Sequence, residues 1–161
     1  MKFLVSPTRD ALSRSRPPVR LFLGFALVLL AALVAQRALA GGLTPAGVFE
    51  YYLGTGEPGT GLPLTALVEE LHGAAFLYGF LLLMLGSLLV VSPLGARSRA
   101  VLTWGATLAC ALDLAAPFVV TWLGTPAAAT LRVASSLTAM GFLAAGAAAL
   151  LLRFGRDGGA A

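Results

Sequence analysis

Charged residues are scarce in this sequence, and long stretches contain none. Only 11% of the 161 residues are charged and 58% are hydrophobic, whereas soluble domains carry about 25% charged residues. A water-soluble protein of this size cannot bury so much apolar surface, so the composition excludes an ordinary soluble domain. A bilayer solvates apolar side chains directly. We therefore expect one compact unit in a membrane, without a separate soluble domain.

Other absences exclude whole classes of chemistry. The single cysteine, Cys110, lies in an apolar run and cannot form an intrachain disulfide, so we interpret it as a small buried residue. Asn and Ile are absent and Lys occurs once, which is typical of a GC-rich bacterial genome. The sequence has no Ser-His-Asp order, CxxC, P-loop or GxGxxG motif. These absences favour a non-enzymatic protein.

Four long apolar segments predict an all-α integral membrane four-helix bundle, because about 20 apolar residues cross a bilayer. The spans are expected at residues 21–40, 64–92, 100–123 and 127–152, between a basic tail (1–20) and a short C-terminal tail (153–161). A loop rich in Gly and Pro, residues 41–63, joins the first two spans. One alternative stays open: Ala38-Leu39-Ala40 resembles a cleavage site, which would make residues 1–40 a signal peptide.

The basic residues predict an orientation. The tail 1–20, the loop 93–99 and the C-terminus hold nine of the eleven Lys and Arg residues (five, two and two). By the positive-inside rule, both termini are cytoplasmic in a multi-pass protein of the bacterial inner membrane. The net charge of +4 reflects this topology and does not indicate nucleic-acid binding.

Ionisable residues within the spans are candidates for a polar intramembrane site, because each costs about 2.5–3.5 kcal/mol at the bilayer centre on insertion scales. They are Glu69, Glu70, His72, Asp113 and Arg132. All five are expected in the outer half of the bundle, where they can converge. The glutamates either pair with Arg132 or Arg37, or form a site for a proton, a metal, a quinone head group or a haem.

Glu69 and His72 form an E-x-x-H sequence, which is half of a di-iron motif. A single histidine gives one axial haem ligand, so haem or metal binding remains an unassigned alternative. Pro117 removes the helical hydrogen bond to the carbonyl of Asp113 and predicts a helix kink with a free acceptor beside a carboxylate. This position is either a proton, water or ligand site, or a structural kink whose aspartate pairs with a neighbouring helix.

Small residues predict the faces on which the spans pack. The fourth span offers Ala134, Thr138, Gly141, Ala145 and Ala148, the third Ala106, Ala109, Cys110, Asp113 and Pro117, and the second His72, Gly79 and Gly86. In the loop, Glu50, Tyr51 and Tyr52 are interpreted as an interfacial anchor rather than a binding loop.

Three short patterns resemble a family of small, uncharacterised four-span bacterial inner-membrane proteins, over roughly residues 20–152. They are Glu50-Tyr51-Tyr52-x-Gly54, Glu69-x-x-His72 and Asp113-x-x-x-Pro117. The family pattern reads near E-x-T-H-F-H with a further histidine, and this sequence has Ala74 and Ser87 where the other histidines fall. If those histidines bind haem or metal, the resemblance implies that this member lacks most of the ligands. The resemblance implies a topology and candidate positions, not an activity.

The sequence therefore predicts a small non-enzymatic inner-membrane protein, a subunit or assembly partner of a larger envelope or respiratory complex. Its expected partners are the lipid bilayer and either a second copy or another membrane protein. One alternative is a redox or cofactor-binding protein that holds haem, metal or quinone. Another is a proton-linked carrier, which the lack of an internal repeat disfavours.

Overall fold

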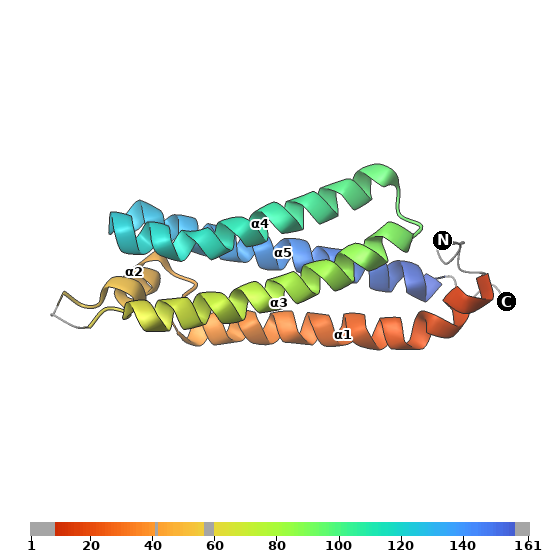
Figure 1. The fold of residues 1–161 in the computed structure, drawn as a ribbon, viewed down its shortest axis with the longest axis horizontal. Coiled ribbons are helices and arrows are strands. Elements are labelled where there is room, and N and C mark those ends of the chain that lie inside the picture. Colours follow the sequence, from red (N-terminus) through yellow and green to blue (C-terminus); the bar gives the residue numbers. More distant parts are fainter. Residues whose placement is uncertain (1–8, 41, 57–59, 157–161) are drawn as a thin grey trace.

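In the computed structural model the described residues form five α-helices, which are drawn in Figure 1: α1 (Arg9–Leu39), α2 (Pro45–Leu53), α3 (Leu64–Val91), α4 (Ala96–Leu123) and α5 (Pro126–Arg156). The structure describes residues 9–40, 42–56 and 60–156, and these ranges contain no strand. The all-α prediction is confirmed. Parts of the two predicted tails, residues 1–8 and 157–161, lie outside the described residues.

Within the part of the chain that the structure describes, four helices are long and apolar enough to cross a membrane, namely Pro17–Leu39 within α1, α3, α4 and Pro126–Arg153 within α5. The 28 residues of α3 extend about 42 Å at 1.5 Å per residue, more than the hydrocarbon core of a bilayer. Large apolar side chains such as Phe25, Phe76 and Leu108 point outward. The protein is thus a multi-pass membrane protein whose helices form a bundle.

Two helical segments differ from the expectation. Residues 9–20, expected to belong to the basic tail, are helical through Pro17 and Pro18, and the first turns of α1 lie at an angle to the rest (Figure 1). Proline tilts a helix by removing hydrogen bonds without necessarily ending it. The loop 41–63 contains α2, which begins because the Thr44 side chain accepts a hydrogen bond from the N–H of Gly47 at 3.1 Å and Pro45 occupies the first helical position.

Helix α5 packs against each of the other four helices. The start of α1, the end of α5 and the α3–α4 turn lie at one end of the bundle, and α2 and the α4–α5 turn lie at the other (Figure 1). An aliphatic cluster that includes Leu23, Leu81 and Leu143 fills the first end. A smaller cluster at the second end joins α2 to its neighbours through Val48, Leu67 and other residues. The polar site lies between these two clusters.

The predicted small-residue faces of α4 and α5 differ in whether the structure buries them. On α4 the predicted face is correct, since Ala106, Ala109, Cys110, Asp113 and Pro117 are all buried. On α5 the prediction is wrong, because Ala134, Thr138, Gly141 and Ala145 are exposed and only Ala148 is half-buried. Helix α5 instead buries Arg132, Ser135 and Ser136. Small residues occur on both faces of α5. The polar contacts of the face that carries Arg132, Ser135 and Ser136 therefore decide how the helix is rotated in the bundle.

On α3, His72 and Gly79 are exposed and Gly86 is half-buried. The predicted stripe on this helix therefore does not form its packing face. The face that packs carries Leu67, Tyr78, Leu81 and Leu85.

Candidate ligand-binding pocket

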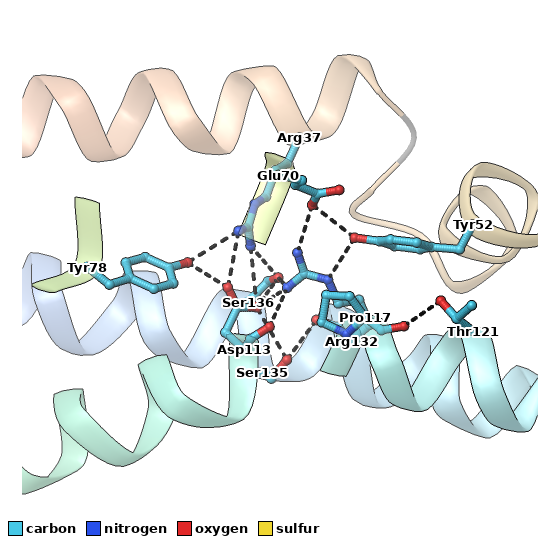
Figure 2. A network of polar contacts seen from close by, with 10 residues as sticks. All are labelled: Arg37, Tyr52, Glu70, Tyr78, Asp113, Pro117, Thr121, Arg132, Ser135 and Ser136. Carbon is cyan, nitrogen blue, oxygen red and sulfur yellow. Dashed lines mark hydrogen bonds and ion pairs between the residues drawn. The ribbon is translucent and has the colours of Figure 1, made fainter. Parts of the chain in front are cut away.

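Asp113 is the centre of the polar site. Its side chain is 1% exposed and forms ion pairs with Arg37 of α1 and Arg132 of α5 (Figure 2). The Arg37 Nη2 lies 3.1 Å from Oδ2. Tyr78 and Ser136 each donate a hydroxyl hydrogen bond to this carboxylate at 2.6 Å. A buried carboxylate is tolerable when it is paired and hydrogen-bonded, and this one meets both conditions with groups from three other helices, α1, α3 and α5.

The backbone of Asp113 also has a partner. The Arg132 Nη1 donates to the Asp113 carbonyl at 3.2 Å, and this is the carbonyl for which Pro117 provides no N–H. The acceptor that the sequence predicted to be free is therefore satisfied by α5. The predicted pairing of Asp113 with a neighbouring helix is also observed. Helix α4 continues as one helix through Pro117, whose own carbonyl accepts from Thr121 at 2.8 Å.

A second carboxylate, Glu70 of α3, lies on the other side of Arg132. The Arg132 Nη2 is 3.4 Å from Glu70 Oε1, and the Tyr52 hydroxyl donates to the same oxygen at 2.9 Å. Burial raises the pKa of Tyr52 to about 12, the Arg132 charge opposes this shift, and the Glu70 charge adds to it. Tyr52 therefore remains a neutral donor at physiological pH.

The two carboxylate oxygens of Glu70 differ. Oε1 accepts from Tyr52 and Arg132, whereas Oε2 is buried and has no hydrogen-bond partner among the described residues (Figure 2). Buried polar atoms are nearly always hydrogen-bonded, so an orphaned carboxylate oxygen requires an explanation.

A pocket of about 430 Å³ lies directly against this network, between α1, α2, α3 and α5. Its polar side consists of Arg37, Tyr52, Tyr78, Arg132 and Ser136, and its apolar wall includes Leu33, Val48 and Leu77. Gln36, Tyr51, Glu69 and Glu70 add further polar groups. The volume falls within the range of about 300–1,000 Å³ that small-molecule sites occupy, and a mixed polar and apolar lining suits an amphipathic ligand.

The structure brings together three of the five predicted site residues: Glu70, Asp113 and Arg132. Glu69 lines the pocket with an exposed side chain. His72 is exposed and is not among the pocket residues. Since residues two apart on a helix point about 200° apart, an inward Glu70 turns His72 away. In the described ranges, no three His, Cys, Asp or Glu side chains are placed to hold a metal ion.

Several residues of the network were not singled out from the sequence. Tyr78 follows Glu70 by eight residues, with Ala74 between them at the i+4 position, and this spacing places all three on one face of α3. Ser135 and Ser136 follow Arg132 by three and four residues, which is the same signal on α5. Arg37, which the sequence offered as a partner for the glutamates, pairs with Asp113 instead.

Glu50, Tyr51 and Tyr52, the three residues predicted to anchor the loop at the interface, lie on α2 and differ in burial. Tyr52 is buried in the network, whereas Glu50 and Tyr51 are exposed. The Tyr51 ring packs edge-on against Tyr52, with 5.0 Å between ring centroids and an interplanar angle of 89°. Burial, followed by the Glu70 charge, raises the pKa of Tyr51. Tyr52 therefore belongs to the candidate site, and Tyr51 lines the adjacent pocket.

Fold and site together define a small multi-pass membrane protein with a polar network inside a helical bundle. Residues 42–157 match the Aq_1264_TM family, described as a transmembrane helical domain, and the chain belongs to this family. This match supports the resemblance to a small transmembrane family. It includes α2 to α5 with Tyr52, Glu70, Asp113 and Arg132, whereas Arg37 precedes it. No curated protein and no solved structure matches the chain.

Proposed function

We propose that this protein binds the polar head group of a lipid-soluble molecule in the pocket beside Asp113, as a non-enzymatic protein of the bacterial inner membrane. The observation that carries the proposal is the 430 Å³ pocket, in which hydrogen-bonding side chains and apolar side chains face the same space. A head group would contact the polar side, and its tail would lie along Leu33 and Leu77 of α1 and α3.

The small residues of the pocket wall support a binding role over a purely structural one. An ion-pair network that only holds helices together needs no adjacent void, because interiors are close-packed. Here Gly73 and Ala74 line the pocket, and a Cβ added at Gly73 would meet nothing within 4 Å. A polar void of this size is filled by water or by a ligand.

The orientation remains part of the proposal. With both termini cytoplasmic, the end of the bundle that carries α2 faces the periplasm, and the pocket is reached from the outer half of the membrane. The positions of nine of the eleven basic residues support this orientation. We retain the division into a basic tail (1–20), a membrane domain (21–152) and a C-terminal tail (153–161).

A second candidate function is that of a subunit or assembly partner of a larger envelope or respiratory complex. The outward face of α5, formed by Ala134, Thr138, Gly141 and Ala145, favours it. Helices associate in membranes through small residues that let backbones approach closely. This face would meet a second copy of the chain or a helix of another membrane protein.

The cofactor and carrier alternatives receive less support. A haem or metal held jointly by Glu69, His72 and Asp113 requires these side chains to converge, whereas Asp113 is buried and His72 is exposed and does not line the pocket. A quinone head group remains a ligand class that the pocket size accommodates. A proton-linked carrier needs polar groups across the whole bundle, whereas outside the site Ser92 is the only buried polar residue among the described residues.

The proposal is tested with full-length protein purified in mild detergent and analysed by native mass spectrometry. We expect a retained small molecule in the wild type and in Ala75→Leu, whose side chain is exposed and does not line the pocket. Ala74→Leu, one position earlier on the pocket wall, should lose it. Equal retention in both variants would exclude the pocket as the binding site. A Soret band that disappears in His72→Ala would favour haem over this proposal.

A further inference from the structure

The charge balance around the pocket restricts the chemistry of its ligand. Two guanidinium groups, Arg37 and Arg132, and two carboxylates, Glu69 and Glu70, line the pocket. A third carboxylate, Asp113, lies behind the lining in ion pairs with both arginines, so the five groups together carry an excess of one negative charge. In a low-dielectric environment this excess disfavours an anionic head group and favours a cationic one. The pocket is therefore not an anion site, although two arginines line it.

The hydrogen-bonding groups of the pocket also differ in availability, because its guanidinium donors are engaged whereas some of its carboxylate acceptors are not. All three side-chain nitrogens of Arg132 and both terminal nitrogens of Arg37 already donate to the network. Their acceptors include Tyr52, Asp113, Glu70, Tyr78 and Ser136. The acceptors are not used up, because Glu70 Oε2 is buried without a partner and Glu69 adds an exposed carboxylate. The ligand that complements these groups donates hydrogen bonds.

We propose, resting on the proposed function, that the pocket binds the primary ammonium group of an amphiphile. The ammonium donates N–H hydrogen bonds to the exposed carboxylate of Glu69 and to Glu70, whose carboxylate rotates to bring its buried, unpartnered Oε2 to the ligand. A primary ammonium has three N–H donors and a positive charge, so it satisfies both the orphaned oxygen and the charge excess. The ring of Tyr51, which lines the same pocket, offers an aromatic face to the cation. The same chemistry occurs in the head group of an aminophospholipid and in a free long-chain amine.

Other head groups fit these observations less well. A quaternary ammonium carries the charge but has no N–H donor for Glu70 Oε2. A quinone is a neutral acceptor and would compete for guanidinium groups that are already engaged. An anionic glycerol phosphate would add to the negative excess. The proposal therefore predicts that a primary ammonium binds more tightly than a quaternary ammonium, a quinone or an anionic glycerol phosphate.

The experiment measures binding of lipids with identical acyl chains to the full-length protein by native mass spectrometry in mild detergent. The probes are phosphatidylethanolamine, phosphatidylcholine and phosphatidylglycerol, with dodecylamine as the free amine. We expect phosphatidylethanolamine to bind roughly tenfold more tightly than the other two phospholipids, since a charge-assisted hydrogen bond contributes about 1.5 kcal/mol or more. Glu70→Gln should abolish most of this preference, and Glu69→Gln should reduce it. Glu50→Gln, the same change on α2 outside this pocket, should preserve it.

Each outcome is decisive. If dodecylamine competes with phosphatidylethanolamine, the ammonium group alone is recognised, and if it does not, the lipid head group as a whole is recognised. Equal binding of all phospholipids that Ala74→Leu still removes would overturn the ammonium proposal and leave the pocket proposal intact. Binding that Ala74→Leu does not affect would overturn both. Circular dichroism of Glu70→Gln, which retains an oxygen acceptor, verifies that a lost preference is not lost folding.

Discussion

Arg132 on α5 donates a hydrogen bond to the Asp113 carbonyl at 3.2 Å, the carbonyl for which Pro117 on α4 provides no N–H. The proline and the arginine thus form a matched pair across two helices. In a bilayer an unsatisfied carbonyl costs several kcal/mol, so a helix-breaking proline is tolerated where a neighbouring side chain satisfies the freed group. The same guanidinium also pairs with the Asp113 carboxylate and with Glu70.

This relationship predicts an energetic coupling between positions 117 and 132. Pro117→Ala restores an N–H for the Asp113 carbonyl, so the loss of Arg132 then leaves one acceptor fewer unsatisfied. We expect Arg132→Met to destabilise the protein by about 1 kcal/mol less in the Pro117→Ala background than in the wild type. Chemical unfolding of all four proteins of this double-mutant cycle in the same detergent measures the difference. Additive effects would show that the arginine does not replace the missing helical bond.

Removing the central carboxylate should have the largest effect on stability. Asp113→Ala leaves Arg37 and Arg132 without their shared partner, and breaking a buried ion pair in this way costs about 3–5 kcal/mol. Thermal unfolding followed by circular dichroism should show a clear loss for Asp113→Ala and little change for the exposed Glu50→Ala. A wild-type-like unfolding curve for Asp113→Ala would indicate that the network contributes little to the fold.

The sequence alone predicts the class of fold and part of the site. Charge-free runs and basic loops are sufficient for helical spans because the bilayer imposes them. They do not fix the rotation of each helix. On α3 both Glu69 and Glu70 are compatible with an inward face, and only packing selects the face of Glu70, Ala74 and Tyr78, which turns His72 outward.

The rotation of α5 is likewise not fixed by the sequence, because Ala134 and Ser135 are neighbours and small residues lie on both faces of the helix. Arg132 was a candidate from the sequence, but its acceptors outside α5, namely Tyr52, Asp113 and Glu70, lie on three different elements. Such long-range pairing depends on the assembled bundle. The Thr44-Pro45 start of α2 was a local signal that the Gly- and Pro-rich composition of the loop obscured.

The environment of Tyr52 gives a prediction about pH. Its pKa rises to about 12 in the folded protein, from an ordinary value near 10. The neutral form is the one that the fold stabilises, so this contribution is complete below pH 10 and is lost as the pH rises from 10 to 12. The absorbance change at 295 nm on titration, taken as wild type minus Tyr52→Phe, should therefore have its midpoint near pH 12. A midpoint near 10 would mean that Tyr52 is solvated and does not donate to Glu70.

The outward face of α5 gives a last prediction, which concerns assembly. A Cβ at Gly141 would meet nothing within 4 Å, so Gly141→Leu should leave the fold of a single chain unchanged. Gly105 on α4 is the contrasting position, because a Cβ there would overlap the Phe142 ring, and Gly105→Leu should lower the unfolding temperature. If the outward face of α5 binds a second copy or a partner helix, Gly141→Leu should lower the association constant at least tenfold, which corresponds to about 1.4 kcal/mol, and so reduce the assembled fraction. Light scattering in detergent, with cross-linking in membranes, measures this fraction. An assembly that withstands Gly141→Leu would place its interface on another helix.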